Sequence, residues 1–405
     1  MSVAANPTPQ AETAATPASS KRALGVACGV HALQDGYTDL VYIMLPIWQA
    51  EFGLAYGAIG MLRGLFVGAM AGFQIPATML SKKVGASIVL AGGAALTGLS
   101  YILAGFSGGF TVLIVALALG GLGAATQHPL ASSLVAGAFP GKAALRALGT
   151  YNFAGDIGKM TLPAVAALMM MAMPWRSTLM SVGLLGIVAG IAILALARRA
   201  PFSEAVEKES KGASASVMPS RRGFSLLLAI SLIDSATRMG FLTFLPFLLT
   251  AKGASLPTIG LALTLVFAGG AVGKLVCAFI GARIGIIATV FLTEGLTAIA
   301  ILALLPMSLQ QGMFLLPIIG IALNGTSSVL YGSVPLFVAQ EQRSRAFGIF
   351  YTGTIGSGAL SPVLYGFIGD ALGIPVTLAV VAGLVLLTLP LALAIRPQLK
   401  AALAN

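Results

Sequence analysis

Three titratable side chains lie four residues apart in the first long apolar segment of the chain, at His31, Asp35 and Asp39. This spacing places them along one face of a helix over about 12 Å. A carboxyl group removed from water accepts a proton more readily than one in water, and an imidazole titrates near neutral pH. We therefore predict that Asp35, together with His31, exchanges protons.

Asp39 has a basic partner in the sequence, because Arg63 lies at a similar depth in the second apolar segment. Charged groups inside a membrane tend to pair with one another. We therefore predict a structural or gating ion pair between Asp39 and Arg63, which leaves Asp35 to carry protons or substrate. The alternative is a static network in which none of these groups moves a proton.

Polar residues in the fourth and fifth apolar segments extend the candidate site. His128 precedes Pro129, which removes a backbone hydrogen bond and tends to kink a helix. A kink beside a titratable imidazole suits substrate binding, although a histidine bonded to a neighbouring carbonyl would have the same sequence. Asp156 and Lys159 can pair within one helix, and Asn152 lies one turn earlier on the same side. This face either lines a substrate cavity or holds an internal ion pair.

The seventh apolar segment carries Asp234 and Arg238, four residues apart. The planar guanidinium group of Arg238 suits a carboxylate or phosphate of a substrate, or it simply neutralises Asp234. Lys274 lies nearer one end of its segment, so its ammonium group can extend to the membrane surface. Tyr37 and Tyr351 are aromatic candidates for the wall of the same cavity.

The composition of the chain places these residues in a membrane. Of 405 residues, 58% are hydrophobic and 9% are charged, whereas a soluble domain carries roughly 25% charged residues. This excludes a soluble enzyme, and it excludes disorder, which needs low hydrophobicity. A charge at the centre of a spanning helix costs about 2.5–3.5 kcal/mol. Nine such charges occur, at Asp35, Asp39, Arg63, Asp156, Lys159, Asp234, Arg238, Lys274 and Glu294; we expect them to be paired or to face water.

The apolar segments are long enough for helices that cross the bilayer, because one span needs about 20 residues. They are continuous and do not alternate as barrel strands do. The sequence therefore predicts an all-α membrane protein with twelve transmembrane helices. Their ranges are 22–48, 57–80, 86–106, 110–138, 143–172, 175–198, 223–250, 257–281, 286–306, 311–339, 344–371 and 374–396.

The positions of the 23 Lys and Arg residues predict the orientation, because such residues favour cytoplasmic loops. Only Arg176 and Lys252 fall in the connectors on the other side, so both termini are predicted to be cytoplasmic, in a bacterial inner membrane. The net charge of +11 reflects this sorting and does not indicate nucleic-acid binding. Residues 1–20 and 397–405 read as cytoplasmic tails, the first of them disordered, and 199–222 as a cytoplasmic linker between domains.

The linker separates two halves that share a pattern. A shift of 200 residues aligns Leu45-Pro46 with Leu245-Pro246, Ile59-Gly60 with Ile259-Gly260, and Gly85 with Gly285. We therefore predict two homologous six-helix bundles in parallel orientation, over 21–198 and 223–396. Such repeats place a substrate site near the membrane midplane, between halves that rock around it.

Two six-helix halves with a cytoplasmic linker resemble the major facilitator superfamily along the whole chain. That superfamily usually carries a loop with glycines, an acid and basic residues between spans two and three. Here Lys82, Lys83 and Gly85 keep the basic pair and a glycine, while Ser81 stands in place of the acid. The resemblance implies transport by alternating access. It also implies that the span carrying Glu294 is peripheral.

Shorter motifs are similar to the fosmidomycin-resistance type of drug exporter within that superfamily. They are His31-x3-Asp35, Leu45-Pro46, Glu51-Phe52 and Gln127-His128-Pro129. This sequence departs from that group at Leu130, where the group tends to have glutamate. We therefore expect a monomeric, proton-coupled secondary transporter that exports a small organic compound or drug, without a cofactor.

Two other kinds of transport remain open. Arg238 could recruit an organic anion for uptake together with protons. A divalent metal ion could be exported through imidazole and carboxylate ligands, namely His31, Asp35, Asp39 and His128.

An enzyme is not expected. His128 and Ser132 lie one turn apart, but this pair lacks the orienting acid and oxyanion site of a hydrolase. The glycine clusters of the spans lack the Gly-Lys-Ser/Thr ending of a nucleotide-binding loop. Energy must therefore come from a gradient, and not from ATP.

Overall fold

The computed structural model describes residues 17–139, 142–199 and 220–403, and these residues form helices without any strand. The first half contains α1 (Pro17–Phe52), α2 (Tyr56–Val84), α3 (Ala86–Gly105), α4 (Phe110–Ala124), α5 (Gln127–Ala138), α6 (Lys142–Ala172) and α7 (Trp175–Arg199). The second half contains α8 (Arg221–Ala251), α9 (Leu256–Leu304), α10 (Leu309–Ser333), α11 (Arg343–Leu372), α12 (Ile374–Val385), α13 (Thr388–Ala394) and α14 (Arg396–Leu403). Two 3₁₀ turns, η1 (Val334–Leu336) and η2 (Gln340–Gln342), connect α10 to α11.

Each predicted span corresponds to a helix or to a pair of consecutive helices. The fourth span is divided into α4 and α5, and the twelfth into α12 and α13. The eighth and ninth spans follow each other in α9, separated by a non-helical backbone at Gly285. Among the described residues, nine segments are long and apolar enough to cross a membrane by themselves. The all-helical membrane fold is therefore confirmed; α1, α6 and α11 are not among the nine, and all three carry polar side chains that face the centre of the molecule.

The ends of the predicted domains differ from the structure at both tails. Helix α1 already begins at Pro17, inside the tail predicted over 1–20, while residues 1–16 lie outside the described part. Helix α14 occupies most of the tail predicted over 397–405, because Leu399 is buried against the apolar core of the second half. The predicted linker over 199–222 lies mostly outside the described residues.

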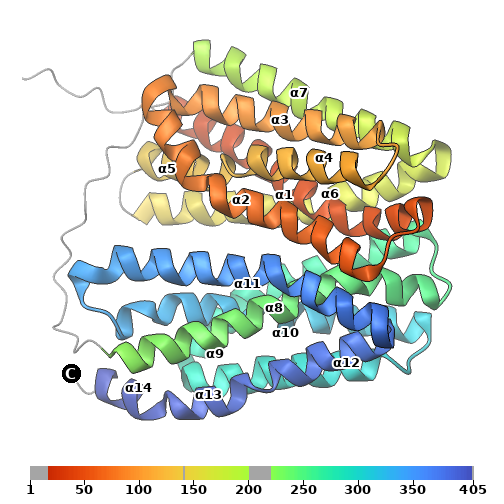
Figure 1. Cartoon of the computed structure of the whole chain (residues 1–405). Helices are drawn as coiled ribbons and strands as arrows, with labels where there is room; N and C mark the ends of the chain where they lie inside the picture. Colours follow the sequence, from red (N-terminus) through yellow and green to blue (C-terminus); the bar gives the residue numbers. More distant parts are fainter. Residues whose placement is uncertain (1–16, 140–141, 200–219, 404–405) are drawn as a thin grey trace, which may run out of the picture.

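The two halves repeat the same turns. Gly53 and Gly253 have φ angles of 61° and 82°, and Gly85 and Gly285 have φ angles of 92° and 81°. Glycine adopts this left-handed region without the steric penalty of a Cβ atom. The 200-residue repeat seen in the sequence is therefore present in the backbone. In Figure 1, α1–α7 form the upper layer and α8–α14 the lower one.

The halves share one apolar core and each has a core of its own. The shared core joins the later part of α1, from Tyr37 to Trp48, with Phe241–Leu249 of α8 and the beginning of α9. These segments lie at the end of the bundle where α1 ends and α2 begins, which we call the far end. The opposite end, where α1 begins and α14 ends, is the terminal end; there the buried apolar clusters belong to one half at a time. The halves are therefore closed against each other at the far end.

Helices α2 and α11 provide the tightest part of this closure. A Cβ atom at Gly60 would collide with the backbone of Pro362, and one at Gly64 with the carbonyl oxygen of Ala359. The carboxylate of Asp370 accepts hydrogen bonds from the backbone N–H groups of Tyr56, at 2.6 Å, and of the next residue, at 2.9 Å. These N–H groups begin α2 and have no partner within that helix, and a negative charge there also suits the helix dipole.

Candidate functional site

A cavity of about 460 Å³ lies between the two halves, in the middle of the helices. Its walls come from α1, α2, α5, α6, α8, α9, α10 and α11. Eight of the nine charged residues predicted inside the spans line it, and Glu294 does not. The eight are Asp35, Asp39, Arg63, Asp156, Lys159, Asp234, Arg238 and Lys274. These charged side chains therefore face a polar cavity at the interface of the two halves and not the lipid, which reduces the free-energy cost of placing them in a membrane.

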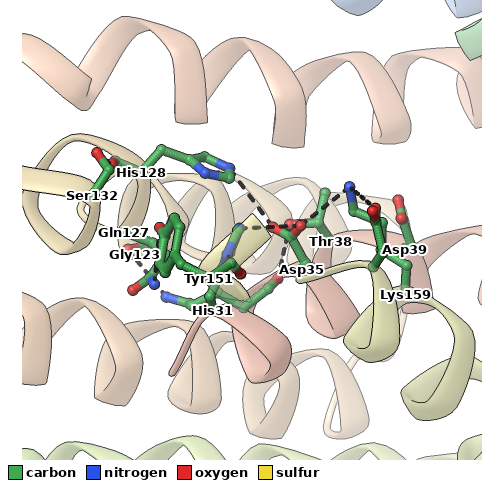
Figure 2. Close-up of polar contacts among 12 residues, drawn as sticks. His31, Asp35, Thr38, Asp39, Gly123, Gln127, His128, Ser132, Tyr151 and Lys159 are labelled. Atoms are coloured by element: carbon green, nitrogen blue, oxygen red, sulfur yellow. Dashed lines mark hydrogen bonds and ion pairs between the residues drawn. The ribbon is translucent and has the colours of Figure 1, made fainter. Parts of the chain in front are cut away.

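Asp35 lies among three basic side chains on one wall of the cavity (Figure 2). Its Oδ2 atom is 3.3 Å from Nε2 of His31 and 3.1 Å from Nζ of Lys159. Its Oδ1 atom is 3.7 Å from Nε2 of His128. The stripe predicted on α1 therefore meets α5 and α6, and His128 lies beside Asp35 as part of the same group.

The contacts of His31 favour a proton between this imidazole and Asp35. Its Nδ1 atom lies 2.8 Å from the backbone oxygen of Tyr151 and must donate, because a carbonyl oxygen only accepts. In a neutral ring the Nε2 atom would then be an acceptor, and it faces a carboxylate oxygen that is also an acceptor. One proton on Nε2 or on Asp35 resolves this conflict. The Tyr151 ring stacks on the imidazole with centroids 4.0 Å apart and fixes its plane.

Lys159 connects this group to the other half of the molecule. It lies 3.7 Å from Oδ1 of Asp156, and the same oxygen is 2.6 Å from Nζ of Lys274 on α9. Asp35, Lys159, Asp156 and Lys274 thus form a row of alternating charge across the cavity. Lys274 does not extend to the membrane surface as predicted, because its ammonium group pairs with the carboxylate of Asp156 inside the cavity.

Asp39 and Arg63 form the ion pair expected from the sequence, with Oδ1 and Nη2 3.4 Å apart. Arg63 also donates to the backbone oxygen of Thr38 at 2.6 Å and to the hydroxyl of Tyr42 at 2.7 Å. The guanidinium group is 1% exposed and lies over the Tyr42 ring. These contacts hold α2 against α1 and suit a structural role.

We expect Arg63→Gln to lower the stability of the protein by about 3–5 kcal/mol, because it leaves a buried carboxylate without its cation. The measurement is thermal unfolding of the purified protein in detergent. The double variant Asp39→Asn/Arg63→Gln removes both charges and should recover most of the loss. An unchanged unfolding temperature in the single variant would contradict a structural ion pair.

The wall formed by the second half is less completely paired. Nη1 of Arg238 donates to the hydroxyl of Ser327 at 3.1 Å, while its Nε atom has no hydrogen-bond partner. Within the described part of the chain, Arg238 forms no ion pair with Asp234, so the neutralisation considered from their spacing is not a direct contact. Arg238 therefore lines the cavity without an ion-pair partner among the described residues, and its buried Nε–H group lacks an acceptor.

Of three other residues predicted to line the cavity, one does so and two do not. Tyr351 lines the cavity, as expected. Tyr37 does not: it is fully buried, stacks on Tyr101 and donates to the backbone oxygen of Val182 at 2.6 Å. Asn152 does not line the cavity either, because the cavity wall on α6 begins one turn deeper, at Asp156.

The basic loop motif lies away from the cavity. Lys82 and Lys83 end α2 with exposed side chains, and the N–H group of Gly85 donates to the oxygen of Ser81 at 2.8 Å. Gly85 thus provides a sharp turn into α3.

Part of the predicted metal site exists as a cluster. Ligand atoms of His31, Asp35 and His128 lie within 4.8 Å of one another, whereas Asp39 is not part of this group. The ammonium group of Lys159 already occupies the remaining side of Asp35. A divalent cation would have to displace that positive charge, so the geometry does not favour metal transport.

Sequence reasoning missed Tyr151 and Ser327 and misplaced Lys274. Tyr151 acts through its backbone oxygen and its ring face, neither of which has a sequence signature. Ser327 is one small hydroxyl in a glycine- and serine-rich segment of α10. The pairing of Lys274 with Asp156 depends on how two halves meet, which spacing along one chain does not encode.

Two bundles of like topology around a charged central cavity define a membrane transporter, and comparison with known proteins identifies its family. The Major Facilitator Superfamily model matches residues 28–233 and 227–404. The chain therefore belongs to this superfamily. It is a multi-pass membrane transporter of small molecules, and it is not an enzyme.

The chain is similar to two proteins of Escherichia coli (strain K12). It is 26% identical to a probable L-galactonate transporter over 357 residues, which are 80% of this chain and 77% of that protein. It is 25% identical to the fosmidomycin resistance protein over 411 residues, covering 96% of this chain and 97% of that protein. The second similarity confirms the suspected relationship to this type of exporter.

A solved structure of a bacterial homolog of the human lysosomal transporter Spinster has the same fold. The TM-score is 0.79 at 14% sequence identity, covering 95% of this chain and 99% of that one.

Proposed function

We propose that the protein is a proton-coupled secondary transporter of a small organic compound that works by alternating access. The contact between His31 and Asp35 carries this proposal, because one proton on either group relieves the opposition of two acceptor atoms 3.3 Å apart. The exposed part of His128, whose side chain is 35% exposed, lies beside the pair in the cavity. A proton entering the cavity can therefore reach Asp35 through an imidazole.

A second proton on this group would change the row of charges across the cavity. With His31 and Asp35 both protonated, Asp35 no longer attracts Lys159. The lysine can then move toward Asp156, which Lys274 of the other half already contacts at 2.6 Å. Two ammonium groups would compete for one carboxylate, which weakens the ion pair that connects the halves. Protonation of the first half would in this way favour a change in how the halves meet.

The charges of the cavity favour an organic anion as cargo. Arg238 lines the cavity and forms no ion pair among the described residues, and Lys159 becomes available when Asp35 is neutral. An anion bound to these two cations stabilises the protonated form of Asp35, so anion and proton travel in the same direction. The similarity to a probable L-galactonate transporter supports this class of cargo. With a proton gradient directed into the cell, the result is uptake.

Export is the second candidate direction, which the sequence predicts. Its support is the similarity to the fosmidomycin resistance protein over nearly the whole of both chains. In export the cargo and the proton would compete for Asp35 and move in opposite directions. The direction of flux under an imposed gradient separates the two candidates.

The distribution of Lys and Arg supports the expected orientation in a bacterial inner membrane, with both termini in the cytoplasm. In that orientation the closed far end faces the outside.

The test uses purified protein in lipid vesicles with an imposed pH gradient and a panel of L-galactonate, fosmidomycin, other organic acids and Zn²⁺. We expect at least one organic anion to accumulate against its gradient when the proton gradient favours symport. Accumulation of a compound only under the reversed gradient would support export. Metal flux without organic flux, or no response to pH gradients with any compound, would contradict the proposal.

We expect Arg238→Gln to weaken binding of the transported anion roughly ten- to hundredfold, because a charge-assisted hydrogen bond contributes about 1.5–3 kcal/mol. The measurement is the concentration that gives half-maximal flux in vesicles. Arg283→Gln is the matched control, since this arginine is exposed and outside the cavity. Equal half-maximal concentrations for Arg238→Gln and wild type would exclude an anion site at Arg238.

A further inference from the structure

Of the nine charged residues named inside the spans, Glu294 is the one that does not line the cavity. It lies in the second part of α9 and is 2% exposed. The resemblance to the superfamily implies a peripheral position for this span, yet the side chain is buried and within hydrogen-bonding reach of the carboxyl group of Asp234. Asp234 is itself 3% exposed and lines the cavity. Two buried acids therefore meet, one at the cavity wall and one behind it.

The charges around this pair do not balance if both acids are ionised. Among the residues that the structure describes, Arg238, one turn along α8, is the charged side chain that acts on both acids. Lys274, another cation of the cavity wall, pairs with Asp156 of the other half. Two carboxylates and one guanidinium group would leave one negative charge at a buried site, which is costly. One proton on the pair makes the group neutral.

The surroundings of Glu294 agree with a proton on this pair. Thr293 donates to the backbone oxygen of Thr289 at 2.8 Å, and Thr326 donates to the Thr293 hydroxyl at 2.6 Å, so these two neighbouring hydroxyl groups bond to each other and to backbone. Oε1 of Glu294 is buried and has no hydrogen-bond partner. An unpartnered oxygen costs less on a neutral carboxyl group than on a carboxylate.

We propose that Asp234 and Glu294 form a second proton-binding site, in which the two carboxyl groups share one proton inside the second half. Asp234 exchanges this proton with the cavity, and Glu294 holds it behind the wall. Ionisation of the pair adds a negative charge beside Arg238, which then competes with an anionic cargo for the guanidinium group. This role in transport rests on the proposed function, whereas the presence of the shared proton does not.

The test is infrared difference spectroscopy of the whole purified protein in lipid at neutral pH, which detects the C=O stretch of a protonated carboxyl group. The spectrum of wild type minus Glu294→Gln should contain a protonated-carboxyl band, and so should wild type minus Asp234→Asn. The matched control is Glu51→Gln, which replaces an exposed acid and should give no such band. Glu294→Asp should retain the band at a shifted frequency.

The absence of a protonated-carboxyl band from both difference spectra would overturn the proposal. If one of the variants does not fold, the other gives the same information, because the shared proton needs both acids. This result is independent of the transport mechanism. If wild type shows the infrared band but no pH-driven flux, the proposed function is contradicted and the second site is not. If wild type shows pH-driven flux but no infrared band, the second site alone is contradicted.

Discussion

Replacing Asp35 by asparagine should reduce flux driven by a pH gradient to the level of vesicles without protein. Asparagine keeps the shape of the side chain but cannot be protonated, so the proton shared with His31 is lost from the cavity wall. The Nζ atom of Lys159 lies 3.1 Å from Oδ2 of Asp35 in wild type. In the variant, the electrostatic attraction between these two side chains is weak at every pH. The halves should still change conformation around bound cargo, because Lys159 retains Asp156 as a partner. Exchange of labelled for unlabelled cargo, with no net proton movement, should therefore continue.

The two measurements together separate coupling from folding. A misfolded protein would lose both net flux and exchange, whereas loss of coupling removes the first alone. Glu51→Gln on the same helix is the matched control, because Glu51 is exposed at the far end and pairs with Arg176 outside the cavity. It should leave both activities near those of wild type, since an exposed ion pair contributes about 1 kcal/mol or less. Normal pH-driven flux in Asp35→Asn would show that Asp35 does not carry the proton.

The fold was predictable because its main signals are local in the sequence. Each apolar segment is long enough to cross the bilayer, and each is ended by a turn or by charges. The shift of 200 residues aligned Gly85 with Gly285, and the backbone has the same left-handed turn at both positions. The helix ends were less predictable at the tails, because α14 is helical only where Leu399 can pack against neighbouring helices.

The candidate site was predictable where one helix holds the relevant groups, and less so where two helices meet. The stripe of α1 and its partner Arg63 follow from spacing and depth. Asp156 and Lys274 belong to different halves, and their ion pair, at 2.6 Å, cannot be predicted from their positions in the sequence. Tyr37 illustrates the opposite error, because an aromatic ring near a charged stripe can equally be buried between α3 and α7, as it is here. Glu294 was assigned to the periphery from the usual place of its span, although a span at the edge of a bundle still has one inward face.

The closure of the far end leads to the second large expected effect, that of Gly60→Leu. This glycine lets α2 approach α11 until their backbones touch, and any side chain at this position meets the backbone of Pro362. Backbone cannot move aside as a flexible side chain can, and overpacking costs about 1–3 kcal/mol. This cost destabilises only the conformation that is closed at the far end. It lowers the ratio of closed to open molecules by roughly five- to 150-fold. We expect transport to fall by a similar factor while the helices of each half remain folded.

The state of the far end can be measured with a single reactive thiol in the cavity. Tyr351→Cys, in a chain with Cys28→Ala and Cys277→Ala, places a thiol on the cavity wall. In vesicles whose outer side corresponds to the far end, a membrane-impermeant maleimide should label this thiol slowly in the parent and rapidly after Gly60→Leu. Gly72→Leu is the matched control, because it is also on α2 but has nothing within 4 Å of its Cβ position. Equal labelling and equal transport in the two leucine variants would mean that contact at Gly60 does not close the far end, since only this contact distinguishes them.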